Sequence, residues 1–258
     1  MGDISLVSII APVFNEAGVL DELIDRLLAV CDRLPGPAEI LLVDDGSSDG
    51  SASKAFAAAD RHRGKIAAVA LERNFGQHAA ILAGFSVARG DTVVTIDADL
   101  QNPPEEIPAL VLRAMDGFDL VGAVRSPRCD SRLRRSASWL MNRFASLATG
   151  VAMTDCGCML RAYSSEVVQA VLGSDLRRPF IPVLAAHYAH RSCEIVVRHE
   201  ARRAGRSKYG LLKLLRLFSD LGGSVRKPGR RAPGPDPRFV IRSLTGAQPA
   251  GESRVVHP

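Results

Sequence analysis

Short apolar runs alternate along the chain with longer segments in which apolar residues recur every three or four positions. The short runs, which contain many β-branched residues, predict strands, and the longer periodic segments predict helices. The predicted strands cover residues 6–12, 39–43, 66–71, 92–96, 120–124 and 193–197. The predicted helices cover residues 19–33, 51–62, 77–89 and 105–115. Because the strands are apolar almost throughout, we expect an α/β fold with a mostly parallel sheet covered by helices on both faces.

Polar residues follow four of the predicted strands, where each strand gives way to a helix. These junctions are residues 15–16, 44–47, 73–74 and 97–102. In open α/β sheets, ligands bind beside the carboxyl ends of the strands. We therefore expect the junctions to converge on one binding site.

Two further segments, residues 128–150 and 209–221, combine apolar residues with Arg and Lys. Both are predicted as amphipathic helices that lie along a surface. An apolar face with basic flanks suits an anionic membrane interface, but docking onto the domain's own core explains the same pattern. The sequence leaves both interpretations open.

The sequence also bears on the cellular compartment. Its apolar runs are far shorter than the roughly 18 residues of a membrane-spanning helix, so we expect no membrane-crossing segment. Residues 4–14 are apolar, but Asp3 stands where a signal peptide would carry positive charge. The 5 cysteines lack paired C-x-x-C spacing and indicate neither a disulfide framework nor a zinc site. We expect a protein of the reducing cytosol.

After residue 221 the composition changes to the Gly-, Pro- and Arg-rich stretch GGSVRKPGRRAPGPDPR. Such a composition is typical of a solvated linker. Residues 239–258 contain one short apolar patch, 239–241. We therefore expect one domain over residues 1–221, followed by a linker and a poorly ordered tail over residues 222–258.

The net charge of +5 conceals an asymmetry between the two halves of the chain. Residues 1–120 carry 9 Lys and Arg against 19 Asp and Glu, whereas residues 121–258 carry 24 against 9. Acidic groups could bind a metal, and basic groups could hold phosphates, an anionic membrane or nucleic acid. Solvated helix faces would also carry such charges. Aromatic residues make up only 5% of the chain, too few for the stacking surfaces of a nucleic-acid binder.

The string VTIDADLQNPP places Asp97 and Asp99 directly after a predicted buried strand. Side chains two positions apart in an extended chain point to the same side, so the two carboxylates repel each other. Mg²⁺ or Mn²⁺ bridging them to a diphosphate would relieve the repulsion, and Gln101 could add an amide oxygen. Two acids stabilised by the dipole of the following helix are the alternative interpretation.

The string EILLVDDGSSDGS indicates a second ligand site. Asp44 and Asp45, followed by glycine, predict a tight turn after a strand. Aspartates at such a junction could accept the N–H of a base or the hydroxyl of a ribose, although turn formation alone explains the same residues. The string APVFNE adds Pro12, Phe14 and Glu16 at a third strand end.

Taken together, these strings resemble the inverting nucleotide-sugar glycosyltransferases of family 2, which have the GT-A fold. The similarity continues through RNFGQHAAILAGFSVARGD, DCGCMLRAY, FIPVLAAH and RRAGRSKYG and covers roughly residues 5–220. Within the family, the chain is similar to the polyprenyl-phosphate glycosyltransferases. DADLQNPPEEIP and GCMLRAY are similar to the group that transfers 4-deoxy-4-formamido-L-arabinose.

The resemblance implies inverting transfer of a sugar from a UDP-sugar to undecaprenyl phosphate, for modification of lipid A or the cell envelope, with residues 1–221 as the catalytic domain. The alternatives are another sugar such as glucose or mannose, another acceptor, and an inactive relative that only binds nucleotide or membrane. No nucleic-acid partner is implied.

Roles for individual residues also follow from the resemblance. The residues implied to hold the nucleotide are Pro12, Phe14, Glu16, Asp44 and Asp45. The residues implied to form the site for the diphosphate and for Mg²⁺ or Mn²⁺ are Asp97, Ala98, Asp99 and Gln101.

For catalysis, the resemblance implies that Arg125 lies near the substrate phosphates. It places Arg202, Ser207 and Lys208, from an R-x-x-G-x-S-K loop, over the phosphates and the acceptor. Asp155 matches the carboxylate proposed as the base in this family. We expect it to orient the acceptor or to take its residual proton.

Similar proteins of the family continue, after the position of Asp220, into two membrane-spanning helices. Here the chain passes into the Gly/Pro/Arg stretch instead. The resemblance therefore implies that the amphipathic segments 132–147 and 209–221 attach the protein to the inner face of the bacterial plasma membrane. It also allows for a homo-oligomer.

Overall fold

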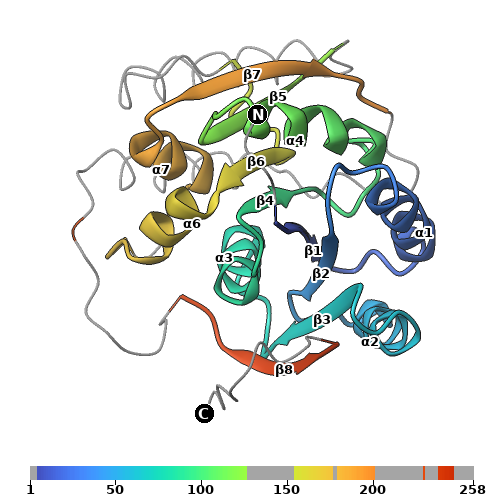
Figure 1. Ribbon diagram of the computed structural model, residues 1–258. Coiled ribbons are helices and arrows are strands. Elements are labelled where there is room, and N and C mark those ends of the chain that lie inside the picture. Colours follow the sequence, from blue (N-terminus) through green and yellow to red (C-terminus); the bar gives the residue numbers. More distant parts are fainter. Residues whose placement is uncertain (1–4, 127–153, 177–178, 201–228, 230–237, 247–258) are drawn as a thin grey trace.

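The computed structural model describes residues 5–126, 154–176, 179–200, 229 and 238–246 (Figure 1). Within this part of the chain, strands form one sheet in the order β7-β5-β6-β4-β1-β2-β3-β8. The strands are β1 (Val7–Val13), β2 (Ala38–Asp44), β3 (Ile66–Leu71), β4 (Thr92–Thr95), β5 (Leu120–Arg125), β6 (Arg161–Ser164), β7 (Ser192–Val197) and β8 (Ile241–Thr245). The helices are α1 (Leu20–Cys31), α2 (Ser51–Arg61), α3 (Gln77–Val87), α4 (Ile107–Met115), α6 (Ser165–Leu172), α7 (Ile181–Tyr188) and the short 3-10 helix η1 (Pro104–Glu106).

Most neighbouring strands run parallel, as predicted. β1 is parallel to β2 and β4, β2 to β3, and β5 to β7. Two strands run the other way, because β6 is antiparallel to β4 and β5, and β8 is antiparallel to β3. The register pairs Val13 with Asp44 and Ile10 with Thr95, so β1, β2 and β4 end at the same edge of the sheet.

Helices cover both faces of the sheet, which confirms the predicted layers (Figure 1). Buried side chains of α3, α6 and α7 form one apolar cluster, and those of α1, α2 and α4 form the other. Successive strand residues point to opposite faces, so Ile10 belongs to the first cluster and Ile9 to the second. Because both faces are covered, the strands are apolar almost throughout.

The six predicted strands and the four helices predicted over residues 19–115 are present, with small differences at their ends, but β6, β8, α6 and α7 were missed. β6 is only 4 residues long and begins with Arg161, which is 1% exposed. A charged first residue conceals so short a strand. Residues 181–186 of α7 are all apolar and all buried. The helix therefore lacks the alternation of apolar and polar faces by which a surface helix is predicted.

The tail after residue 222 contains packed structure that the sequence analysis did not expect. β8 extends the sheet by pairing with β3, and Phe239 joins the apolar cluster beneath α3. Arg238 is buried and donates a hydrogen bond to the carbonyl oxygen of Leu172, at the end of α6, at 2.8 Å. The expectation of a poorly ordered tail is therefore wrong for residues 238–245, whose partners lie far away in the sequence.

Several further expectations fall on residues that the structure does not describe. These are the amphipathic segments 128–150 and 209–221 and the predicted domain boundary at residue 221. Among the described helices, none combines the length and apolar character that crossing a membrane requires.

Candidate active site

The carboxyl ends of β1, β2 and β4 bring the predicted site residues to one edge of the sheet. The backbone N–H of Asp45 donates to the carbonyl oxygen of Val13 at 2.8 Å, and that of Ile96 donates to Ile10 at 3.0 Å. These bonds continue the ladder up to the points where β2 and β4 end. The junction residues of the three strands, with the aspartates at 44, 45, 97 and 99, therefore lie side by side.

Hydrogen bonds join the loop after β1 to the loop after β2. The backbone N–H of Asn15 donates to Ser47 Oγ at 2.9 Å, and Asn15 Oδ1 accepts the N–H of Ser48 at 2.8 Å. Asn15 adopts a φ of 55°, a left-handed conformation that asparagine tolerates better than most residues. The N–H of Glu16 donates to Ser51 Oγ at 3.0 Å. Pro12 and Phe14, both half-buried, lie at the end of β1 beside these hydrogen-bonded loops.

Asp45 is buried and its carboxylate holds the next loop of the sheet. Its two oxygens accept the backbone N–H groups of Phe75 at 2.7 Å and Gly76 at 2.9 Å, immediately before α3. Burial raises the pKa of Asp45 to about 6, although the two hydrogen bonds oppose this shift. The carboxylate thus positions the start of α3, a role that the sequence analysis did not foresee.

Asp44 is 2% exposed and has one engaged and one unengaged oxygen. Its Oδ2 accepts the backbone N–H of Ser47 at 3.1 Å, which forms the predicted turn. Its Oδ1 is buried and has no hydrogen-bond donor among the described residues. Buried acceptors are nearly always satisfied, so this oxygen suits an N–H or O–H group of a ligand.

Asp97 and Asp99 follow β4 directly, and both are half-buried. Asp97 Oδ1 accepts Gln77 Nε2 at 2.5 Å, and its Oδ2 accepts Asn102 Nδ2 at 3.4 Å. Asp99 Oδ1 accepts the backbone N–H of Gln101 at 3.1 Å. Amide donors on two sides thus hold the Asp97 carboxylate in one orientation.

These side chains fit a divalent cation. Carboxylate and amide oxygens are the ligands that Mg²⁺ and Mn²⁺ prefer. Within the described residues, no group of three or more His, Cys, Asp or Glu side chains is gathered as a metal site. A cation held by Asp97, Asp99 and Gln101 would therefore complete its shell with water and substrate oxygens, as Mg²⁺ commonly does.

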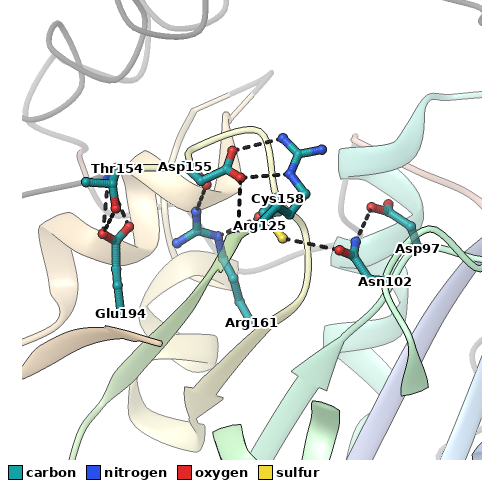
Figure 2. Close-up of polar contacts among 8 residues, drawn as sticks. All are labelled: Asp97, Asn102, Arg125, Thr154, Asp155, Cys158, Arg161 and Glu194. Carbon is teal, nitrogen blue, oxygen red and sulfur yellow. Dashed lines mark hydrogen bonds and ion pairs between the residues drawn. The ribbon is translucent and has the colours of Figure 1, made fainter. Parts of the chain in front are cut away.

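Arg125 and Asp155 form an ion pair at the end of β5 (Figure 2). Arg125 Nε donates to Asp155 Oδ2 at 2.7 Å, and Nη2 donates to Oδ1 at 2.9 Å. The Asp155 side chain is 1% exposed and that of Arg125 17%. Asp155 is therefore satisfied by a guanidinium.

The loop that carries Asp155 is held by a second arginine, Arg161 of β6. Its Nη2 donates to the carbonyl oxygen of Asp155 at 2.7 Å, and its Nε donates to that of Cys158 at 3.0 Å. Gly122, its partner on β5, leaves room for this side chain, since a Cβ there would lie 2.9 Å from Arg161 Nη1.

The loop of Asp155 is joined to the loop of Asp97. Cys158 Sγ donates to Asn102 Oδ1 at 3.7 Å, and Asn102 also contacts Asp97 (Figure 2). The backbone N–H of Glu200 donates to the carbonyl oxygen of Gln101 at 2.9 Å. Glu200 therefore lies beside the loop that carries Asp99.

Some predicted site residues cannot be placed, and two unpredicted ones take part. Arg202, Ser207 and Lys208 lie outside the described residues. The sequence analysis missed Gln77 and Asn102 as partners of Asp97. The sequence offered only weak signals for them. Gln77 is a polar residue at the start of an apolar helix, and Asn102 precedes two prolines.

A family model described as Glycosyl transferase family 2 matches residues 8–172, which is more than half of the chain. The chain belongs to this family. It is therefore a glycosyltransferase, and the matched residues include Asp45, Asp97 and Asp155.

Curated relatives of this glycosyltransferase share about half of its residues. An undecaprenyl-phosphate 4-deoxy-4-formamido-L-arabinose transferase from Edwardsiella ictaluri is 52% identical over 84% of this chain and 67% of the relative. A protein of the same name from Pseudomonas aeruginosa is 54% identical over 84% of this chain and 64% of the relative. The chain thus spans about two thirds of the length of these relatives.

Solved structures show the fold. Glucosyl-3-phosphoglycerate synthase from Mycobacterium tuberculosis, in complex with phosphoglyceric acid, has a TM-score of 0.62 at 18% identity and covers 87% of this chain and 81% of its own. Mannosyl-3-phosphoglycerate synthase from Rubrobacter xylanophilus has a TM-score of 0.60 at 19% identity, covering 86% of this chain and 72% of its own. These likenesses confirm the GT-A fold.

Proposed function

We propose that this glycosyltransferase transfers 4-deoxy-4-formamido-L-arabinose from its UDP derivative to undecaprenyl phosphate, with inversion, for modification of lipid A or the cell envelope. The observation that carries the proposal is the 52–54% identity, over 84% of the chain, to relatives that bear this name. The convergence of the acidic junctions after β1, β2 and β4 supports it, because ligands of open α/β sheets bind at such an edge.

On the donor side, Asp44 would hold the nucleoside. Its buried Oδ1 has no donor among the described residues, so the N–H of uracil or a ribose hydroxyl would satisfy it. Pro12, Phe14 and Glu16 would line the same edge, and Asp45 would hold the neighbouring loop in place.

Asp97, Asp99 and Gln101 would hold Mg²⁺ or Mn²⁺ next to the diphosphate, with Ala98 between the two carboxylates. When bound, the cation would stabilise the negative charge of the leaving group. The structure of glucosyl-3-phosphoglycerate synthase in complex with Mn²⁺, UDP and phosphoglyceric acid has a TM-score of 0.58 to this chain at 18% identity, and covers 86% of this chain and 76% of its own. Gln77 and Asn102 would keep Asp97 in its ligating orientation.

The basic residues would act on the charge that develops as the bond from the sugar to the diphosphate breaks. Arg125 lies at the end of β5, and the resemblance to the family assigns Arg202 and Lys208 to the substrate phosphates. Preorganised cations at such a position stabilise the leaving group without proton transfer. We therefore expect loss of Arg202 or Lys208 to lower turnover more than nucleotide binding.

A donor panel tests the proposed function. Purified protein would be offered UDP-sugars with detergent-dispersed undecaprenyl phosphate and Mg²⁺ or Mn²⁺, and the mass of the lipid product would be measured. We expect the mass of the formamido-arabinose adduct. A hexose adduct, transfer to a soluble acceptor, or nucleotide binding without turnover would each replace the proposal with the corresponding alternative.

Two variants test whether the acidic pair serves the reaction. Asp99→Asn should abolish most lipid product, because it removes a carboxylate ligand from the diphosphate site. Asp60→Asn, at an exposed position of α2, is the matched control and should leave product formation unchanged. Equal activity of both variants would exclude Asp99 from the site.

We further propose that the protein works on the inner face of the bacterial plasma membrane, attached through segments 132–147 and 209–221. Basic residues near anionic lipid contribute about 1 kcal/mol each, and residues 121–258 carry 24 Lys and Arg. Sedimentation with anionic liposomes should fall as salt rises. Binding that is absent, or equal on neutral liposomes, would contradict attachment by charge.

A further inference from the structure

The surroundings of Asp155 differ from those expected of a proton acceptor. Both of its carboxylate oxygens accept N–H groups from the Arg125 guanidinium, at 2.7 and 2.9 Å. The backbone N–H of Arg125 adds a longer bond of 3.4 Å to Oδ2. Two parallel charge-assisted hydrogen bonds fix both partners in direction as well as in distance. The two side chains therefore form one unit.

The backbone around this unit is also fixed. Arg161, which is 1% exposed, binds the carbonyl oxygens of Asp155 and Cys158 and so holds the turn between them. The hydroxyl of Thr95 donates to the carbonyl oxygen of Met159 at 2.5 Å, which ties the same turn to β4. Such bracing holds the ion pair of Asp155 and Arg125 in one orientation.

The Arg125 guanidinium lies beside Gly157, and the side chain of Arg125 is 17% exposed. Gly157 is exposed, and a Cβ built on it would lie 3.4 Å from Arg125 Nη2. A side chain at this position would therefore contact the guanidinium. The planar fork of a guanidinium matches the oxygens of a phosphate as well as those of a carboxylate.

We infer that Asp155 is a positioning residue, which aims the Arg125 guanidinium at a phosphate group of the substrates and does not itself accept a proton. This inference rests on the proposed function. An oxygen of the acceptor phosphate forms the new bond to the anomeric carbon, the bond from that carbon to the diphosphate breaks, and its electron pair leaves with UDP. A phosphate monoester has its second pKa near 6, so at neutral pH the acceptor is largely ionised and needs no base.

A double-mutant cycle separates positioning from base catalysis. Asp155→Asn removes the charge and retains the shape, whereas Arg125→Lys retains both a cation and the Asp155 carboxylate but loses the planar fork. If Asp155 acts through Arg125, each single variant lowers turnover about 10- to 100-fold. The turnover of the double variant is then no lower than that of the less active single variant. Independent roles would make the two losses multiply, and that result would overturn the inference.

The pH dependence gives a readout that a purely structural defect would not move. If Asp155 were the base, Asp155→Asn would remove the acidic limb of the pH–rate profile while Arg125→Lys would keep it. Under the inference, both variants keep the acidic limb of the wild-type protein and differ from it only in height. Asp155→Glu, which can still bind a guanidinium, should recover part of the lost turnover.

Binding measurements identify which phosphate Arg125 meets and do not require turnover. If it meets the donor diphosphate, both single variants weaken binding of UDP but leave binding of uridine unchanged, as measured by calorimetry. If it meets the acceptor, both weaken binding of undecaprenyl phosphate in detergent, as measured by native mass spectrometry. Either coupled loss supports the inference, and unchanged binding of both ligands would overturn it.

The turnover and binding measurements distinguish failure of this inference from failure of the proposed function. A wild-type protein that forms no lipid-linked sugar would refute the proposed function, while coupled losses of UDP or lipid-phosphate binding would still support the pair. Arg113 and Asp116, an exposed pair 3.3 Å apart at the end of α4, provide the control. Arg113→Lys and Asp116→Asn should leave binding and turnover unchanged. If Asp155→Asn does not fold, Arg125→Lys and Asp155→Glu carry the test.

Discussion

Asp45 and Asp155 are both aspartates that follow or face the carboxyl ends of strands, and both are almost completely buried, at 2% and 1% exposure. Asp45 is satisfied by two neutral backbone N–H groups at the start of α3. Asp155 is satisfied by the charged fork of Arg125. The first carboxylate thus lacks a counter-charge among these partners, whereas the second has one in direct contact.

The difference shows how one residue type serves two ends of the same site. On the nucleotide side, a carboxylate holds backbone, and the held loop presents Gln77 to Asp97. On the phosphate side, a carboxylate holds a cation, which is itself suited to contact substrate oxygens. Burial raises the pKa of Asp45 to about 6, so this carboxylate is expected to make stability depend on pH near neutrality.

The largest expected effect follows from breaking the ion pair. Asp155→Asn should lower the free energy of unfolding by about 3 kcal/mol, because removing one partner of a buried pair leaves the other charge uncompensated. Urea unfolding at neutral pH measures this loss. Asp45→Asn, measured alongside, should cost clearly less, since it removes no ion pair. Equal losses would mean that the two carboxylates do not differ as described.

The next effect concerns pH. Burial raises the pKa of Asp45 from 3.8 to about 6, so its protonation favours the folded state. Its contribution to stability is complete below about pH 4 and is lost as the pH rises through about 6, a change on the order of 3 kcal/mol. The free energy of unfolding of Asp45→Asn minus that of the wild type should therefore rise between about pH 4 and pH 7. A flat or falling difference in the urea unfolding series would contradict the raised pKa.

The contrast between the two aspartates also marks what the sequence could predict. Apolar runs and strand-end polar residues predicted the parallel sheet, its helices and the place of Asp44, Asp45, Asp97 and Asp99 at one edge, because these depend on local pattern. The partners of Asp45 and Asp155 lie 30 residues away in the chain. Such pairings depend on tertiary packing, which no local pattern encodes.

The same reason explains the missed elements. β6 is a short strand that begins with the charged residue Arg161, and a charged residue is not typical of a buried strand. Arg161 is buried there because it binds the loop that carries Asp155. β8 stands after a Pro-rich stretch and pairs with β3, more than 150 residues earlier. Both strands are determined by the partners they meet in space.

A smaller effect tests whether the loop held by Asp45 serves the metal site. Gln77→Leu removes the amide that orients Asp97, and the loss of such a supporting hydrogen bond typically weakens metal binding 10- to 100-fold. We expect about tenfold weaker binding of Mn²⁺ in the presence of UDP, measured by calorimetry. Gln169→Leu, at an exposed position of α6, is the control. If Gln77→Leu binds Mn²⁺ as tightly as the control, Asp97 does not depend on this amide.

The smallest effect concerns the space that Gly122 leaves for Arg161. Gly122→Ala would place a Cβ 2.9 Å from Arg161 Nη1. Because Nη1 is the far end of a side chain that can shift, we expect a loss of only about 1 kcal/mol in the free energy of unfolding, at the low end for overpacking. Gly18→Ala is the matched control, since nothing lies within 4 Å of a Cβ there.

A shift of Arg161 would also move the turn that carries Asp155, because the same guanidinium binds the carbonyl oxygens at both ends of that turn. Gly122→Ala should therefore reduce turnover while leaving the Asp45 side, and hence uridine binding, unchanged. A variant that weakened uridine binding as much as turnover would show that the two sides of the site are not independently braced. In that case the contrast between Asp45 and Asp155 would describe two contacts of one rigid unit, because a disturbance at β5 would reach the loop before α3.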